Sequence, residues 1–336
     1  MKPSPSLAAL LGVGLLVSAV GVILSTPTPA RGRESPRIAQ LARAAEWGVW
    51  KIRQGRVTSL DELAAEVPSF VHRGRPGVTA GPTPAPVRPH FPAHARKPVL
   101  YLYSGERCRS VGVRVRVSLP ISGSTLYYPN AVATSTGLAS SLEFRGALEP
   151  ARRAHDCLPS SARPARAPRG HFWRALRRVP ASMFTSGEES ERFIFYEALT
   201  DLRTPFVFYG AGEHASVSLR PDLRGTSGRE DVVFAVHGRR YRRITPTGPA
   251  PTSLFEGEER PLSALMAELR EQLMARGLSA PEARSLLDTW RPDLVEASGD
   301  RRIYFIDRAD YDAMLPLTIS PRPRELVRVG MVLELP

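Results

Sequence analysis

Residues 97–119 (KPVLYLYSGERCRSVGVRVRVSL) constrain the fold more than any other part of the sequence. Residues 99–103 are apolar at every position, which predicts a strand buried on both faces. From Val111 to Leu119, valine or leucine alternates with glycine, arginine or serine. This period of two predicts a strand with one buried and one solvated face. The sequence therefore predicts packed β-structure from Lys97 onward.

Residues 1–30 have the layout of an export signal. Lys2 precedes an uncharged run at residues 7–24, and a proline-broken segment of small residues follows. Three interpretations stay open: a signal peptide with Thr28 and Ala30 before the cleavage point, an uncleaved anchor, or a buried core helix. Positive charge beyond the run opposes export, because it tends to stay in the cytoplasm: Arg31, Arg33, Arg37 and Arg43. We predict a signal peptide or membrane anchor at 1–30, and an extracytoplasmic location (periplasm, cell envelope or secreted) for the rest.

The next two segments are interpreted as a small helical region at 31–72 and a linker at 73–96. A helix over 36–54 is predicted because apolar residues recur there at helical spacing: Ile38, Leu41, Ala45, Val49 and Ile52. A capping-box spacing of Ser59 and Glu62 predicts a second helix over 58–67. Residues 73–96 are rich in proline and hold no acidic residue, which is typical of an extended linker. The prolines also argue against a metal site at His90 and His94.

Strand candidates follow residue 97 at short intervals, separated by glycine, proline and acidic turns. They lie at 125–128, 141–145, 192–197, 205–209, 215–219, 231–236, 241–244, 302–306, 315–319 and 326–335. This cadence favours antiparallel pairing over alternating strand and helix units. The predicted fold class is mostly β, an antiparallel sandwich or curved sheet, and α+β overall. Residues 97–336 are predicted to form one β-rich globular domain.

A helical hairpin interrupts the β-pattern, with helices predicted at about 262–276 and 280–290. Leucine and methionine repeat on one face of the first helix, and Gly277 is typical of a helix C-terminus. Ser279 and Glu282 have the spacing of a capping box that opens the second helix. We predict that the two apolar stripes pack against the sheet.

The chain carries a formal net charge of +13 from 46 basic and 33 acidic residues. Nearly all the basic residues are arginine, a skew more typical of codon composition than of phosphate recognition. The strongest local feature is residues 150–180, which hold many arginines and the single acid Asp156. This segment is either an anion-binding loop or a solvated excursion that needs no partner. The anion-binding candidates are Arg174, Arg177 and Arg178.

Cys108 and Cys157 are the only cysteines. In an exported domain they are predicted to form a disulfide, and two unpaired thiols are the alternative. The sequence has no CxxC, HExxH, GxSxG, SxxK or phosphate-loop pattern. We therefore predict no metal and no cofactor, and no catalytic residue is assigned.

Three further groups favour a structural interpretation. The glycines of GAGEHA at 210–215 predict a hairpin turn, because the third glycine of a nucleotide-binding loop is missing. His214 and His237 are interpreted as ordinary surface or core histidines. Asp307, Asp310 and Asp312 lie close together, a spacing that by itself suggests a calcium site. Arg308 lies among them and no glycine is present, so a helix start is predicted instead.

Five blocks in the last 240 or so residues resemble a family of uncharacterised bacterial proteins that often carry an export signal. The blocks are KPVLYLY, RFIFYEA, GLSAPEARSLLDTWRP, LPLTISPRP and LVRVGMVLEL. The resemblance implies a domain boundary near Lys97 and extracytoplasmic use. It implies no activity and no site residue.

The sequence predicts an exported protein of unknown activity, interpreted as a non-catalytic envelope or surface module. Two alternatives are an extracytoplasmic hydrolase with a site built from distant residues, and a polyanion-binding protein that uses the 150–180 arginines. Expected partners are an anionic envelope polymer or a membrane surface, because the charge favours adhesion to anions. No specific nucleic acid is predicted, and the sequence does not identify a protein partner.

Overall fold

The computed structural model describes residues 40–53, 60–74, 91–106, 108–119, 125–135, 140–150, 163–202, 204–210, 212–220 and 231–335. Contacts place these residues in one unit that runs from Ala39 to Pro336. The apolar run at 7–24 lies outside the described residues, so the signal or anchor stays a prediction. Within the described ranges, no helix has the length and apolar character needed to cross a bilayer.

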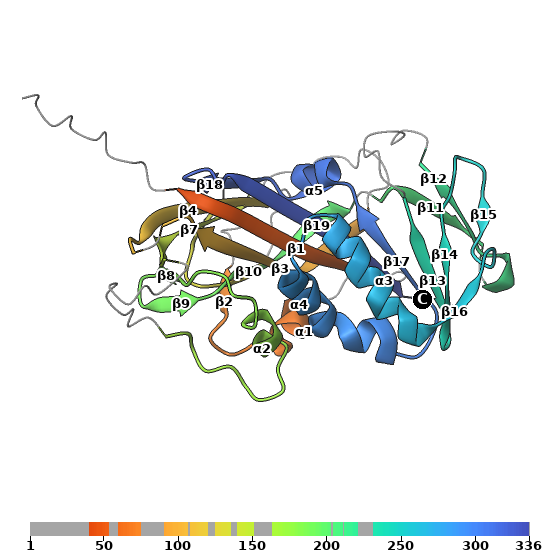
Figure 1. The fold of residues 1–336 in the computed structure, drawn as a ribbon, viewed down its shortest axis with the longest axis horizontal. Helices are drawn as coiled ribbons and strands as arrows, with labels where there is room; N and C mark the ends of the chain where they lie inside the picture. The colour runs from red at the N-terminus through yellow and green to blue at the C-terminus, as the bar shows by residue number, and fades with distance from the viewer. Residues whose placement is uncertain are drawn as a thin grey trace, which may run out of the picture. The chain divides into compact units, whose positions relative to one another are not determined.

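A ten-stranded sheet is the largest element of the unit (Figure 1). Its strands are β1 (Leu41–Arg53), β2 (His72–Gly74), β3 (Phe91–Ser104), β5 (Thr125–Tyr128), β10 (Ile194–Leu202), β13 (Val233–His237), β14 (Arg240–Ile244), β16 (Glu259–Pro261), β17 (Arg301–Ile306) and β19 (Glu325–Leu335). Their spatial order is β16-β14-β13-β17-β19-β1-β3-β10-β5-β2. The pairs are antiparallel except β1 with β19, which is parallel.

The predicted helix over 36–54 is wrong, because residues 41–53 form β1 at the centre of this sheet. The strand is buried from Ala44 through Trp50 without alternation. Helices cover one of its faces and a second sheet covers the other, so both faces are apolar and the period of two disappears. The globular domain therefore begins near residue 40, and not at Lys97.

The end of the predicted linker at 73–96 is also strand. β3 begins at Phe91 and pairs with both β1 and β10, which places His94 opposite Leu199. His90 lies outside the described residues. The linker prediction is therefore corrected at both ends, because residues 73 and 74 belong to β2 and residues 91–96 belong to β3. Residues 75–90 are not described.

Two smaller sheets complete the β-structure. One has the order β18-β4-β7-β8-β9, with β6 also paired to β7, and the other has the order β11-β12-β15. Their strands are β4 (Val111–Leu119), β6 (Val132–Ser135), β7 (Ser140–Leu148), β8 (Phe184–Ser186), β9 (Glu189–Glu191), β11 (Phe206–Tyr209), β12 (Ser216–Leu219), β15 (Thr252–Ser253) and β18 (Leu317–Ser320). In β4 the valines are buried while Arg114 and Arg116 are exposed, which confirms the predicted alternation.

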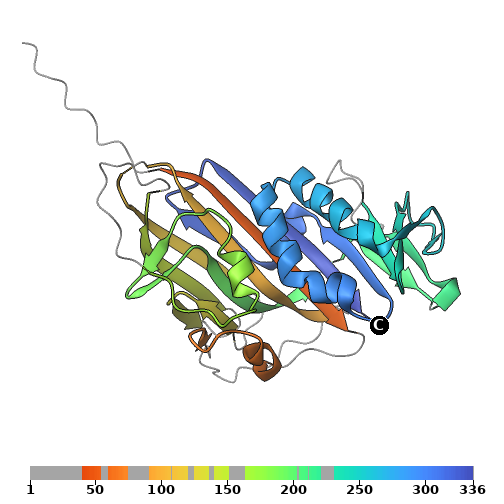
Figure 2. The ribbon, with the colours of Figure 1, turned by 60° about the horizontal axis from the view of Figure 1, so that its bottom comes forward.

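The helices are short except for one hairpin. They are α1 (Leu60–Ala65), α2 (Trp173–Leu176), α3 (Leu262–Ala275), α4 (Ala280–Arg291) and α5 (Arg308–Met314). Figure 2 shows α3 and α4 lying against one face of the large sheet. Gly277 ends α3 with φ +101°, and the amide of Leu278 donates to the carbonyl of Leu273 at 3.2 Å. Ser279 and Glu282 form the predicted capping box of α4.

Two apolar cores lie on the two faces of the large sheet. Trp47 of β1 faces the first core, which also contains Leu269 of α3 and Trp290 of α4. Trp50 faces the second core, where β4 and β7 contribute Val115 and Phe144. The protein is thus mostly β with antiparallel sheets and a C-terminal helical region, which confirms the predicted α+β fold class.

Candidate functional site

An arginine-rich surface lies on residues 163–178, which we call the arginine segment. Its exposed arginines are Arg163, Arg166, Arg169, Arg174 and Arg178. The sequence holds no Asp or Glu between Asp156 and Glu188, so nothing within the segment neutralises this charge. Among the described residues, Arg178 alone of these five has an ion-pair partner, Asp288 at 3.3 Å. The segment is therefore a concentrated cationic surface.

Buried side chains hold the arginine segment to the large sheet. Trp173 and Leu176 of α2 have no exposed surface. The Trp173 ring packs against Phe193 and Phe195, with 5.0 Å between ring centroids in each pair. The hydroxyl of Tyr101 donates a hydrogen bond to the Leu176 carbonyl at 3.2 Å. Trp173 and Leu176 are thus buried in the core, while five arginines of the segment stay at the surface.

Arg177 is held inside this anchor, which corrects its assignment as an anion-binding candidate. Its Nε and Nη2 donate to Oε2 of Glu191 at 3.0 and 2.6 Å, and Nε1 of Trp173 donates to the same oxygen at 2.8 Å. Glu191 has no exposed surface, so Arg177 is the counter-ion of a buried carboxylate. The sequence offered no signal for this pair, because Arg177 follows α2 and Glu191 lies on β9, and residue spacing does not show that the two meet. Arg174 and Arg178 remain candidates.

A second charged cluster lies beside the arginine segment, where β3 bulges. The register of β3 shifts against β1 between Trp47 and Val49, and against β10 between Phe195 and Ala198. Lys97 lies in the bulge with φ 52°, a positive value that no other described residue except glycine adopts. Bulges of this kind re-aim a side chain out of the regular alternation of a strand.

Lys97, Arg96 and Glu66 form an ion-paired group. Nζ of Lys97 donates to Oε2 of Glu66 at 2.8 Å, and Arg96 pairs with the same oxygen. The ammonium also lies 5.0 Å from the ring centroid of Phe172, in the arginine segment, and 4.6 Å from that of Trp290. Burial raises the pKa of Glu66, but the two cations outweigh it and lower the value to about 2. This group ties the end of α1 to β3 and to the arginine segment.

Glu197 of β10 is a second carboxylate beside the same cations. It is buried, and no described side chain donates a hydrogen bond to either carboxylate oxygen. Burial raises its pKa to about 7, against the opposing effect of Lys97 and Arg96. As the pH rises, the folded protein therefore keeps the proton of Glu197 up to about pH 7, whereas the unfolded chain has already lost it at a lower pH.

We expect Glu197→Gln to change how stability depends on pH. The contribution of Glu197 to stability is fully present below the pKa of the unfolded chain, and it is lost as the pH rises through about 7. Glutamine does not titrate. The unfolding free energy of the variant, relative to that of the wild type, should therefore rise by roughly 2 to 3 kcal/mol when the pH is raised from about 5 to about 8.5. Urea unfolding at both pH values measures this gain. A difference that is the same at both values would contradict the assignment.

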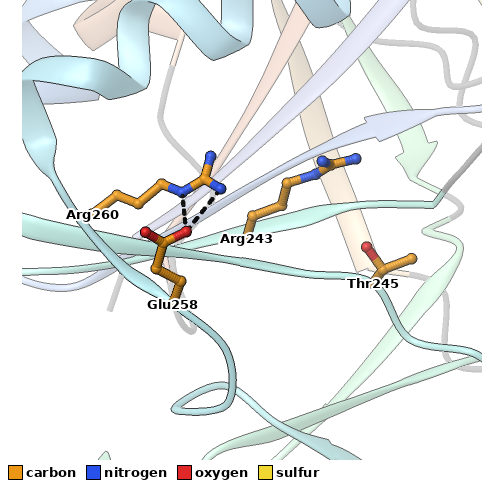
Figure 3. Close-up of a pocket in the computed structure, with 4 residues that line it drawn as sticks. All are labelled: Arg243, Thr245, Glu258 and Arg260. Carbon is orange, nitrogen blue, oxygen red and sulfur yellow. Dashed lines mark hydrogen bonds and ion pairs between the residues drawn. The ribbon is translucent and has the colours of Figure 1, made fainter.

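Another arginine-lined surface lies at the β16 edge of the large sheet (Figure 3). A shallow cavity of about 250 Å³ is lined by Arg243, Thr245, Glu258 and Arg260. Arg260 donates to Glu258 from Nε at 3.2 Å and from Nη2 at 3.0 Å, and it also pairs with Glu268 of α3. Because carboxylates neutralise Arg260, this surface attracts anions less than the arginine segment does.

The remaining sequence candidates occupy structural positions. Gly210 and Gly212, both with positive φ, lie in the turn between the paired strands β11 and β12, as predicted. Asp307 is the N-cap residue of α5, and Asp312 pairs with Arg328, in line with the predicted helix start. Within the described ranges, no group of three or more His, Cys, Asp or Glu side chains is placed to hold a metal ion.

Cys108 is disulfide-bonded. Cys157 is the only other cysteine in the sequence, and it lies outside the described residues. The bond between the two therefore stays a prediction.

Comparison of the chain with protein-family models, curated proteins and solved structures found no match. The resemblance of the KPVLYLY and LVRVGMVLEL blocks to exported bacterial proteins stays a prediction, and the site is assigned on its geometry alone.

Proposed function

We propose that this protein is an extracytoplasmic binding module that holds an anionic polymer on the arginine segment. The observation that carries the proposal is the set of exposed arginines on residues 163–178, four of which have no ion-pair partner among the described residues. The anchor through Trp173 and Arg177 supports it as well, because a cationic surface fixed to a folded core loses less conformational entropy on binding than a free loop does.

A polymer fits this surface better than a bilayer does. Membrane-surface segments insert apolar side chains between lipids while their cations contact the head groups. Here Trp173 and Leu176 are buried in the core, and the partly exposed ring of Phe172 is in contact with Lys97, so the segment has little apolar surface to insert. The remaining attraction is electrostatic, which suits a flexible chain of phosphate, sulfate or carboxylate groups.

Location outside the cytoplasm is part of the proposal and rests on the sequence of residues 1–30. Protease added to intact spheroplasts should then digest the domain. Digestion only after lysis would place the domain in the cytoplasm and would overturn this part of the proposal.

We expect Arg166, Arg169 and Arg174, replaced together by glutamine, to weaken heparin binding by roughly tenfold or more at moderate salt. The slope of log affinity against log salt should also fall in magnitude by about 2, because fewer counter-ions are released. Heparin serves as the polyanion probe, and titration at several salt concentrations measures both quantities. Arg177 is left intact, because its loss would leave Glu191 buried and unpaired.

A matched control removes the same charge elsewhere. The triple replacement of Arg114, Arg116 and Arg145 by glutamine changes exposed arginines of β4 and β7. If both triple variants lose affinity equally, net charge alone drives binding and the arginine segment is not a site. If the first triple variant binds heparin as the wild type does, the proposed function is wrong.

A further inference from the structure

A pocket lies where the three-stranded sheet meets the end of β13, β17 and β19, and we call it the sheet-end pocket. Figures 1 and 2 show β11 and β12 beside this end of the large sheet. The cavity has a volume of about 190 Å³. Its lining includes two arginines, two acids and one histidine, namely Arg301, Arg302, Asp300, Glu334 and His237. It is separate from the arginine segment and from the cavity of Figure 3.

Arg301 is the fixed cation of the sheet-end pocket. Only 2% of its surface is exposed. Its Nε donates to the carbonyl of Leu294 at 2.9 Å, and its Nη1 donates to those of Ala297 and Gly299 at 2.8 and 2.9 Å. Its Nη2 is buried and has no partner among the described residues. The guanidinium is thus held rigidly by neutral groups, with one nitrogen left to donate to a ligand.

The positive charge of Arg301 is only partly compensated. Burial lowers its pKa, while Asp293 and Asp300 act in the opposite direction without forming an ion pair with it. A buried cation that lacks a direct counter-ion is costly, and an anion bound beside it offsets that cost. The electrostatics of the pocket therefore favour the binding of a negatively charged group.

His237 contributes a second polar atom. Its Nδ1 lies 3.1 Å from Oδ2 of Asp300, and its ring stacks on Phe255 with 4.5 Å between centroids. These contacts fix the orientation of the ring, while Nε2 is buried and has no partner among the described residues. Such a pair resembles the base of a hydrolase, but the residues that line the cavity include no serine, threonine or cysteine. The pair is therefore assigned to binding.

The other charged pair leaves room for one negative charge. Arg302 donates to Glu334 at 3.2 Å, so these two side chains neutralise each other. Asp300 offsets part of the charge of Arg301, and it forms an ion pair with His237 when that ring is protonated. A single carboxylate fits this balance, whereas a doubly charged phosphate would face the two acids of the lining.

The rest of the lining is apolar or lacks side chains. It consists of Ala215, Ala235, Leu254 and Leu335, with Gly210 and Gly212 in the turn. Gly212 has φ +55°, and a side chain there would have no neighbour within 4 Å, so the turn leaves open space. A ligand with a compact apolar body and one charged end would bury both parts in this cavity.

We propose that the sheet-end pocket binds a small monocarboxylate with His237 in its protonated form. The carboxylate accepts from Arg301 and from Nε2 of His237, whose Nδ1 donates to Asp300, and the apolar body packs on Leu254 and the alanines. This site is independent of polymer binding on the arginine segment.

The test uses the full chain and pairs of probes that differ only in charge. Butanoate is compared with butanamide, and benzoate with benzamide, by ligand-observed NMR and calorimetry. We expect saturable binding of the acids and tenfold to hundredfold weaker binding of the amides, because the amide oxygen can still accept from Arg301 but carries no negative charge. No saturable binding of either acid up to about 10 mM, or equal binding of acid and amide, would overturn the proposal.

Variants locate the binding. His237→Phe keeps a ring that can stack on Phe255 but removes Nε2, and we expect about tenfold weaker binding of the acids. Ala215→Leu fills the cavity without a change of charge and should abolish binding. Arg260→Gln, in the cavity of Figure 3, should leave binding unchanged. Undiminished binding by both pocket variants, with each folded as judged by its melting temperature, would overturn the site.

Discussion

Replacing Arg328 by methionine is expected to destabilise the folded protein by about 3 to 5 kcal/mol. Arg328 is 5% exposed and pairs with Glu46, which has no exposed surface and also accepts a hydrogen bond from Tyr196. The guanidinium lies 4.3 Å from the ring centroid of Tyr311. Its removal would leave the carboxylate of Glu46 without its cation between the sheets. Urea unfolding of wild type and variant at about pH 7 measures the loss.

Two further variants separate the buried charge from the packing. Arg308 pairs with Asp312 on the surface, where both side chains are more than 40% exposed, so Arg308→Gln should cost less than about 1 kcal/mol. Combining Arg328→Met with Glu46→Leu removes both charges and should recover part of the loss. If Arg328→Met costs no more than Arg308→Gln, the pair does not stabilise the fold in the way its burial implies.

Leu269→Ala is expected to cost about 2 to 5 kcal/mol, because it opens a cavity in the first core. Leu269 has no exposed surface, and it belongs to the same apolar cluster as Trp47 of β1 and Met331 of β19. The side chain thus connects the helical hairpin to the central strands. The melting temperature and the unfolding free energy of the purified variant measure the effect.

Two other positions of the hairpin serve as controls. Met274 on the same helix is 43% exposed, so Met274→Ala should change stability by less than about 1 kcal/mol. Ser279→Ala removes the cap of α4 and should cost only about 1 kcal/mol. If Leu269→Ala melts like the wild type, the hairpin is not a structural clamp and its stripe serves another purpose.

Most strands and the hairpin were predictable because their signals are local. In β4, apolar and polar residues alternate along the sequence, and in the structure the valines are buried while the arginines between them are exposed. Gly277, Ser279 and Glu282 set the hairpin turn through backbone contacts only a few residues apart. Local chemistry of this kind does not depend on what the rest of the chain does.

The placement of β1 was not predictable from its own residues. Its apolar residues fit a helix as well as a doubly buried strand, because burial on both faces removes the period of two. The deciding interactions are the pairs with β19 and β3, and β19 lies at the other end of the chain. Pairing over that distance depends on tertiary structure. For this reason the predicted start of the domain, Lys97, lies well after the observed start near residue 40.

The sites follow the same division. The sequence by itself determined that residues 150–180 are cationic, because composition and charge are properties of the chain. Tertiary structure decided that Arg177 neutralises Glu191 while Arg174 remains exposed. It also decided that His237, Arg301 and Glu334 share one pocket. An electrostatic or hydrogen-bonding role depends on which groups meet in space and how far water is excluded, and sequence spacing specifies neither for residues on different strands.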